Sequence, residues 1–293
     1  YRMDIREGAE SSMKPLALPR GRKLSFSGRP LIMGILNLTN DSFFSQSRIP
    51  DMTSLIERAR KMIDDGADIL DIGAESTRPG ADPVPLEEEE RRLLPALKAL
   101  RKEFPDVVIS VDTYKSAIAE AALELGADII NDISGLSFDP DMAKVAARFG
   151  VPVIIMHIKG TPKDMQRDPR YEDVIGEIKD FLKEKIEYAV SCGVNPEQIV
   201  IDPGLGFGKG HDHNLQILKH VQEFRSLGKP ILIGHSRKGT ISKILGCKGP
   251  EEALYGTLAI SAYCAMNKIE IIRVHDVLEN RHVVEMIDAI QRA

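Results

Sequence analysis

From residue 30 to the end, the chain alternates short apolar runs with longer helical stretches, and this alternation constrains its fold more than any other feature. The apolar runs lie at Leu31–Leu36, Asp68–Ile72, Val107–Val111, Asp128–Ile133, Val151–Met156, Gln198–Ile201, Pro230–Ile233 and Ile269–Val274. Their nearly continuous apolar character is typical of strands that are covered on both faces. Helical patterns follow them at about residues 51–65, 86–103, 115–125, 140–149, 171–192, 213–227, 238–267 (broken near Gly246–Pro250) and 276–291.

Eight such strand–helix units predict an α/β fold, a closed (β/α)₈ TIM barrel. The alternative is an open doubly wound sheet, which has fewer units and a glycine-rich first turn. The first turn here, Asn37-Leu-Thr-Asn-Asp-Ser42, contains no glycine. We therefore predict one barrel domain over residues 30–293. A short N-terminal extension over residues 1–29, with a hairpin near Lys23–Ser27, is expected to precede it.

Composition excludes several classes of protein. The 293 residues carry 39 basic and 44 acidic side chains, a net charge of −5, without the basic block that would indicate a nucleic-acid partner. No apolar run approaches the roughly 18–20 residues that span a bilayer, so no membrane partner is expected, and the N-terminal stretch lacks the apolar segment of a secretory signal. The three cysteines form no CxxC pair, which favours reduced thiols in a cytoplasmic protein.

Polar residues follow every predicted strand. In such barrels the carboxyl ends of the strands meet at one rim, where active sites are built. The residues delivered to this rim are Asn37, Thr39 and Asp41; Glu75 and Arg78; Asp112; Asn131 and Asp132; His157; Asp202 and Lys209; His235 and Lys238; and Arg273 and His275. One polar group at a strand end is usually a cap or a satisfied buried group, but a polar residue after all eight strands indicates an active site.

These residues form two groups with different chemistry. Asp112, Asn131, Asp202 and Lys238 supply hydrogen-bond acceptors, an amide and a cation, which suit the edge of a 2-amino-pyrimidinone ring. The second group is mostly cationic and suits a phosphate or diphosphate; it comprises Asn37, Arg78, Arg273 and His275. Two glycine-rich runs, Gly204–Gly210 and Gly234–Gly239, add backbone N–H groups that favour an anion.

At these positions the chain resembles the dihydropteroate synthases, from about Leu31 to the C-terminus. The resemblance is carried by Gly34-Ile-Leu-Asn37, Glu75-Ser-Thr-Arg-Pro-Gly80, Ser110-Val-Asp-Thr113, Ile130-Asn-Asp-Ile133, Met156-His157, Asp202-Pro-Gly-Leu-Gly-Phe-Gly-Lys209, Ser236-Arg-Lys238 and Ile272-Arg-Val-His275. It implies a folate-biosynthesis transferase that condenses 6-hydroxymethyl-7,8-dihydropterin diphosphate with 4-aminobenzoate, giving 7,8-dihydropteroate and diphosphate. It also implies sulfonamides as inhibitors, and it favours a homodimer, with the apolar stretch Leu254–Met266 as a buried or interface helix.

The resemblance assigns roles residue by residue. The implied pterin site consists of Asp112, Asn131, Met156, Asp202, Gly206 and Lys238. The implied diphosphate site consists of Asn37, Arg78, Arg273 and His275, with Asn37 as the ligand of a Mg²⁺ cofactor. The implied aminobenzoate site consists of Thr77, Arg78, Pro79, Phe207, Lys238 and Gly239. The residues implied in catalysis are Asp112, Asp202, Lys238, Arg273, His275 and Arg78, acting in an SN1-like loss of Mg²⁺-diphosphate.

Three positions depart from the family pattern, and three other functions stay open. Asn40 replaces a usual proline, Gly239 a usual serine, and Leu205 a common phenylalanine.

Lys238 is compatible with a Schiff-base aldolase. A methyltetrahydrofolate:corrinoid methyltransferase is another pterin-binding barrel, although it lacks the diphosphate residues. The departures at Asn40 and Gly239 leave room for a non-catalytic pterin-binding protein.

Overall fold

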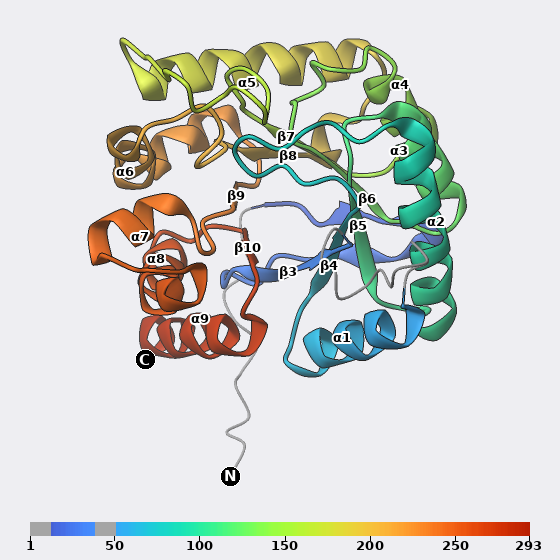
Figure 1. Ribbon diagram of the computed structural model, residues 1–293, viewed down its shortest axis with the longest axis horizontal. Coiled ribbons are helices and arrows are strands. Elements are labelled where there is room, and N and C mark those ends of the chain that lie inside the picture. The colour runs from blue at the N-terminus through green and yellow to red at the C-terminus, as the bar shows by residue number, and fades with distance from the viewer. Residues whose placement is uncertain (1–12, 39–50) are drawn as a thin grey trace.

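In the computed structural model, residues 13–38 and 51–293 are described, and they form a closed barrel of parallel strands surrounded by helices (Figure 1). The barrel strands are β3 (Leu31–Asn37), β4 (Ile69–Gly73), β5 (Val108–Asp112), β6 (Ile129–Asp132), β7 (Val153–Met156), β8 (Ile199–Asp202), β9 (Leu232–Ile233) and β10 (Ile271–Val274). Neighbours in the sheet follow chain order from β3 to β8, and β10 joins β3 to β9. The prediction of a (β/α)₈ barrel is therefore confirmed.

Closure occurs between β8 and the start of β9. The two strands are joined by a single parallel bridge, Ile201 to Ile231, and the backbone N–H of Ile201 donates to the carbonyl of Pro230 at 2.9 Å. Strand β9 has only two residues, where the sequence predicts four. The seventh strand of the barrel, β9, is thus its shortest, and it leads directly into the segment that carries His235 and Lys238.

Helices cover the outside of the barrel in chain order (Figure 1). They are α1 (Met52–Asp64), α2 (Leu86–Glu103), α3 (Ser116–Glu124), α4 (Met142–Phe149), α5 (Val174–Ser191), α6 (His211–Lys219), α7 (Gly239–Leu245), α8 (Leu254–Met266) and α9 (Val277–Arg292). The predicted break in the seventh helical stretch is confirmed: α7 ends at Gly246, which has a left-handed φ of 68°, and a 3₁₀ turn at Pro250–Ala253 precedes α8. None of the helices in the described ranges is long and apolar enough to span a bilayer.

A short hairpin closes the N-terminal end of the barrel. Strands β1 (Leu16–Ala17) and β2 (Lys23–Leu24) pair antiparallel, and the 3₁₀ turn Pro19–Gly21 connects them. Leu16, Leu18, Leu24 and Phe26 are buried in one apolar cluster with strand residues that include Met33, Ile69, Ile129, Val200 and Ile271. The hairpin therefore forms the apolar floor of the barrel. The division of the chain into an extension and a barrel domain at residue 30 stays a prediction.

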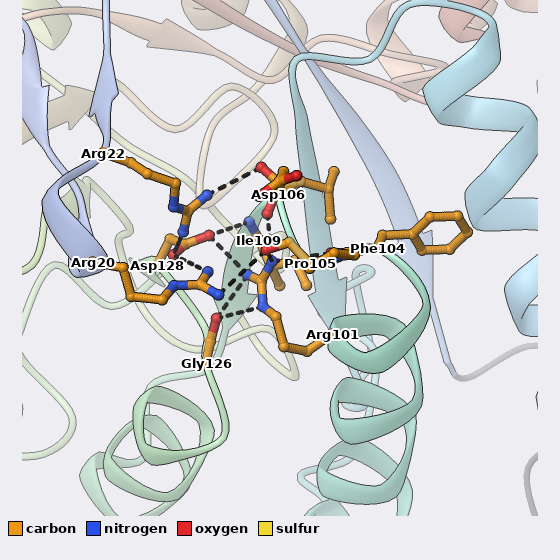
Figure 2. A network of polar contacts seen from close by, with 10 residues as sticks. Arg20, Arg22, Arg101, Phe104, Pro105, Asp106, Ile109, Gly126 and Asp128 are labelled. Carbon is orange, nitrogen blue, oxygen red and sulfur yellow. Dashed lines mark hydrogen bonds and ion pairs between the residues drawn. The ribbon is translucent and has the colours of Figure 1, made fainter.

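Asp128, a fully buried carboxylate at the start of β6, ties this hairpin to the barrel (Figure 2). Arg22 donates to one of its oxygens, Arg101 of α2 donates to the other at 2.9 Å, and Arg20 lies 3.6 Å away. The same carboxylate accepts the backbone N–H of Ile109 at 2.9 Å. Three guanidinium groups and a strand amide thus surround one buried anion, at the end of the barrel where stability rather than catalysis usually resides.

Candidate active site

A cavity of about 720 Å³ lies at the carboxyl ends of the strands. Eleven of the residues predicted for the site line it: Asn37, Thr77, Arg78, Pro79, Asp112, Gly206, Phe207, Lys238, Gly239, Arg273 and His275. A recess of about 20 Å³ adjoins it, and the remaining three, Asn131, Met156 and Asp202, line this recess together with Asp112 and Lys238. The fold thus brings these fourteen residues to one mouth, whereas the rim candidates Asp132, His157 and His235 are buried and line neither space. Thr39, Asn40 and Asp41 lie outside the described residues.

The two-residue period of the strands explains which side chains reach this mouth. Ile69, Ile129, Ile154, Val200 and Ile271 point into the barrel as part of its apolar floor. The residues two positions farther along each strand point the same way, and they are Asp71, Asn131, Met156, Asp202 and Arg273. Each of these five strands, β4, β6, β7, β8 and β10, therefore contributes an apolar residue to the floor and a polar residue or a methionine directly above it.

Arg273 of β10 is held between two carboxylates. Its Nε donates to Asp71 Oδ2 at 2.6 Å, and one terminal nitrogen donates to Asp112 Oδ2 at 3.1 Å. Asn131 also donates to Asp71 Oδ2, at 3.2 Å. Burial and the neighbouring Asp71 carboxylate raise the pKa of Asp112, although Arg273 opposes this shift. Two acidic side chains and one guanidinium thus share a space from which water is largely excluded.

Asp202 and Lys238 form a second pair of opposite charges at the recess. Burial raises the pKa of Asp202 to about 6, whereas burial and the nearby Arg273 lower the pKa of Lys238 to about 8. Asp202 Oδ1 accepts the backbone N–H of Gly204 at 2.7 Å. The Lys238 ammonium lies 4.4 Å from the centre of the Phe207 ring, within the range of a cation–π contact.

The segment after β8 is fastened by a buried lysine. Lys209 is wholly buried, and its Nζ donates to the carbonyl oxygens of Phe207 (2.9 Å) and His157 (3.3 Å) and lies 2.9 Å from His157 Nδ1. Burial lowers the pKa of Lys209, and the Asp202 charge opposes this. Lys209 thus joins the strand ends of β7 and β8 and holds the backbone of the loop that carries Phe207.

The segment after β4, residues 74–85, leans over the cavity. Its base is fixed because Tyr114 and Lys115 donate to the Glu75 carboxylate. Its tip is joined to the segment after β7, since the N–H of Gly80 donates to the carbonyl of Pro162 at 2.8 Å. Between these two attachments, Thr77 is half-buried and Arg78 is exposed at the cavity rim.

His275 and Gly239 lie on the other side of the cavity. The hydroxyl of Ser236 is 2.8 Å from His275 Nδ1 and accepts the backbone N–H of His275 at 3.1 Å. Burial and the nearby Arg237 lower the pKa of His275 to about 3, so its ring is neutral at pH 7. Gly239 begins α7 without a positive φ, and a Cβ there would meet only His211, at 4.0 Å. The backbone therefore does not require glycine at this position.

Comparison with known proteins agrees with this geometry. The family model described as "Pterin binding enzyme" matches residues 33–275. Dihydropteroate synthases from Synechocystis sp. and Escherichia coli are each 42% identical to this chain, over 95% and 92% of it and 96% and 94% of their own lengths. The chain belongs to the dihydropteroate synthase family.

Solved dihydropteroate synthases share its fold. The Yersinia pestis enzyme, in a complex with a sulfonamide drug, superposes with a TM-score of 0.89 at 39% identity and covers 96% of this chain and 100% of its own. The Thermus thermophilus enzyme, in a complex with 4-aminobenzoate, superposes with a TM-score of 0.83 at 43% identity over 94% of this chain and 99% of its own. A Clostridium difficile dihydropteroate synthase was solved in the presence of pteroic acid, with a TM-score of 0.85 at 44% identity over 92% and 99%.

Sequence reasoning missed Asp71, which contacts Arg273 below this mouth, and cavity-lining residues such as Gln166 and Asn214, and it gave Lys209 too small a part. Asp71 is inside a strand rather than after it, so a search at strand ends passes over it. Its signal was available, because it is the one charge within the apolar run Ile69-Leu70-Asp71-Ile72. Lys209 was placed at the rim by its sequence position, but its complete burial against two carbonyl groups follows only from the folded loop.

The loop that carries Phe207 depends on glycine at position 204. Gly204 has a φ of 72°, and a Cβ there would overlap the carbonyl oxygen of His157. We expect Gly204→Ala to lower the free energy of unfolding by about 3 kcal/mol or more, because it adds a clash to a left-handed backbone. Urea unfolding measures this change. Gly228→Ala is the matched control, since Gly228 has a φ of 65° and open space around it, and it should cost only about 1 kcal/mol. Equal losses would contradict the clash.

Proposed function

We propose that this chain joins 6-hydroxymethyl-7,8-dihydropterin diphosphate to 4-aminobenzoate, forming 7,8-dihydropteroate and releasing diphosphate. It is thus an enzyme, a transferase of folate biosynthesis. The observation that supports this most is the adjacency of two unlike sites. A narrow recess with carboxylates and an amide opens into a wider cavity that carries arginine and histidine side chains. A planar hydrogen-bonding ring with a diphosphate tail has this distribution of polar groups.

The recess suits the pterin ring. Asp112, Asn131 and Asp202 offer acceptors, and the Asn131 amide also donates. Met156 contributes an apolar surface beside them, and Phe207 is in the same apolar cluster. Lys238 can donate to ring nitrogen or oxygen atoms. Gly206 leaves room for the ring beside Lys238, because a Cβ at this position would contact the Lys238 side chain. We assign these residues to pterin binding.

The wider cavity suits the diphosphate. Arg273 and Arg78 supply positive charge, and neutral His275 supplies a ring N–H. Among the described residues no group of three or more His, Cys, Asp or Glu side chains could hold a metal by itself. Mg²⁺ is commonly held by one or two protein oxygens together with substrate phosphates. Asn37, whose amide oxygen is a hard ligand at the cavity wall, fits a Mg²⁺ that is bound jointly with the diphosphate.

Aminobenzoate is assigned to the outer part of the cavity. Thr77, Arg78 and Pro79 come from the segment after β4, and Phe207, Lys238 and Gly239 line the same cavity from the segments after β8 and β9. In this place the amine can approach the pterin methylene group from the side opposite the diphosphate. Sulfonamides resemble 4-aminobenzoate in shape, and we propose that they compete with it for the outer part of the cavity.

The chemistry follows from these positions. The bond between the pterin methylene carbon and the diphosphate oxygen breaks in an SN1-like step, and a C–N bond to the aminobenzoate forms, after which the nitrogen loses a proton. Arg273, Arg78 and His275 stabilise charge on the departing oxygens, and bound Mg²⁺ would add Lewis-acid stabilisation there. Asp112 and Asp202 stabilise positive charge that spreads over the ring. The aniline-type nitrogen is already neutral at pH 7, so no strong base is required.

A direct assay tests the proposed function. Folded protein supplied with the pterin diphosphate, 4-aminobenzoate and Mg²⁺ should release dihydropteroate, detected by mass, and a sulfonamide should inhibit the release. Lys238→Met should retain the fold and lose most of the activity, since it removes the donor at the recess. Folded, wild-type protein that forms no product would refute the proposal.

Pterin binding should depend on pH through Asp202. The carboxylate accepts N–H bonds only when ionised, and its pKa is raised to about 6 by burial. Lowering the pH from 7.5 to 5 therefore protonates it, and the affinity for 6-hydroxymethylpterin should fall about tenfold. Calorimetric titration measures this. Asp202→Asn should bind weakly and lose the part of the pH dependence that is due to Asp202, while Asp112, whose pKa is also raised, keeps its own part. Unchanged wild-type affinity across this range would exclude Asp202 as an acceptor.

We also propose a homodimer that is formed through α8. The inward face of this helix carries two polar side chains that make hydrogen bonds within the protein. Thr257 accepts the backbone N–H of Arg237, and the Ser261 hydroxyl lies 2.7 Å from His235 Nε2. Its outward residues are apolar, with Tyr255 81% and Met266 62% exposed, and the adjoining α9 exposes Met286 and Ile290. An exposed apolar face of this kind is typical of a surface that another molecule covers, and a second copy of this chain would cover it.

Sedimentation velocity measures the proposed dimer. The wild-type protein should sediment as a dimer, and the double variant Tyr255→Glu, Met266→Glu should sediment as a monomer because it places charge in the apolar interface. Leu215→Glu is the matched control, since Leu215 is exposed on α6, and it should stay dimeric. A monomeric wild-type protein would overturn this arrangement.

A cytoplasmic location is proposed from the cysteines. Cys192, Cys247 and Cys264 are all free thiols in the structure. Free thiols persist in reducing compartments, so this state supports the location expected from the sequence.

A further inference from the structure

Asp71 occupies the interior of the barrel, below the rim at which substrates would bind. Its side chain is fully buried, and its Oδ2 receives two donors, the Arg273 Nε at 2.6 Å and the Asn131 amide at 3.2 Å. Its Oδ1 is equally buried and has no hydrogen-bond partner among the described residues. Asp71 thus joins Asn131, which is assigned to the pterin, with Arg273, which is assigned to the diphosphate.

Arg273 has two competing demands in the free protein. Its terminal nitrogen bonds Asp112 at 3.1 Å, yet the proposed function requires Asp112 to accept N–H groups of the pterin and Arg273 to contact the diphosphate. This nitrogen can serve the diphosphate only after it leaves Asp112, and its departure frees Asp112 Oδ2 for the N–H groups of the pterin. The bond to Asp71 uses a different nitrogen of the guanidinium, Nε, and it does not have to break for this exchange.

We propose that Asp71 is a positioning residue, which anchors the Nε of Arg273 while the outer guanidinium nitrogen exchanges Asp112 for the diphosphate. This inference rests on the proposed function and deepens it. When the pterin ring supplies N–H groups to Asp112, Arg273 is released toward the cavity but stays attached to the barrel. The fixed Nε bond keeps the guanidinium at a defined distance from the methylene carbon at which the bond breaks.

Two features of the site support the anchor. First, Asp71 and Asp112 lie close enough for the Asp71 charge to raise the pKa of Asp112, so the two carboxylates together favour retaining the arginine in the barrel. Second, with Asp71 removed, Asp112 would be the nearest remaining carboxylate partner of Arg273, and the arginine would compete with the pterin ring. Asp71 therefore couples the two halves of the substrate site, and coupling of this kind acts equally in both directions.

Calorimetry tests the coupling with separate halves of the substrate. Inorganic diphosphate with Mg²⁺ is titrated into wild-type protein with and without saturating 6-hydroxymethylpterin. The pterin should tighten diphosphate binding at least about fivefold, the lower limit of typical coupling. Asp71→Asn, which keeps the size and removes the charge, should abolish this gain. In steady-state kinetics it should lower kcat about tenfold or more and leave the KM for aminobenzoate within about twofold.

Asp128→Asn is the matched control, because Asp128 is also a buried carboxylate bound by arginines, but at the opposite end of the barrel (Figure 2). It should lower the melting temperature and leave kcat and the coupling unchanged. Wild-type protein that shows no coupling would overturn the proposal even if Asp71→Asn fails to fold. Full coupling and full kcat in folded Asp71→Asn would do the same. Both results are distinct from failure of the proposed function, which would appear as absence of dihydropteroate from the wild-type assay.

Discussion

Closure of the sheet is the constraint on which the whole site depends. Arg273 and Asp71 are 202 residues apart in sequence, and they meet because β10 pairs with β3, which pairs with β4. The strand order places the last strand beside the first, and the bridge between β8 and the start of β9 completes the barrel around them. Closure also directs alternate side chains of every strand into one small interior. Polar and charged side chains from several strand ends are therefore forced together, and the bonds among them replace solvation by water.

The buried charges are balanced locally. Arg273 contacts two carboxylates, and Lys238 is near both Asp202 and Asp112. An unpaired buried charge would cost several kcal/mol, so each cation is retained by the acids around it. The balance is incomplete, since Asp71 Oδ1 is unpartnered among the described residues and the pKa of Asp112 is raised. Unsatisfied acceptors and shifted pKa values of this kind are typical of a functional site, where a ligand can supply the missing N–H groups and negative charge.

The two ends of the barrel divide stability from function. At the N-terminal end, the hairpin fills the floor with apolar side chains, and Asp128 joins it to α2 through arginine contacts (Figure 2). This anion has all its partners within the protein and needs none from outside. At the carboxyl end, the same strands present acids and bases to a cavity of about 720 Å³. The apolar floor and the saturated ion network can therefore hold the barrel closed while the mouth carries charges that lower stability.

The sequence by itself determined the barrel, the family and the residues of the mouth, because an eightfold strand–helix alternation and polar residues after strands are local patterns. It placed Asp112, Asn131 and Asp202 at one rim for this reason. It did not determine which charges pair, since Asp71 and Arg273 lie far apart in the chain and only the register of the closed sheet brings them into contact. Nor did it show the burial of Lys209, which depends on carbonyl groups from two different loops. Pairing and burial are properties of distances in space, and only the tertiary structure decided them.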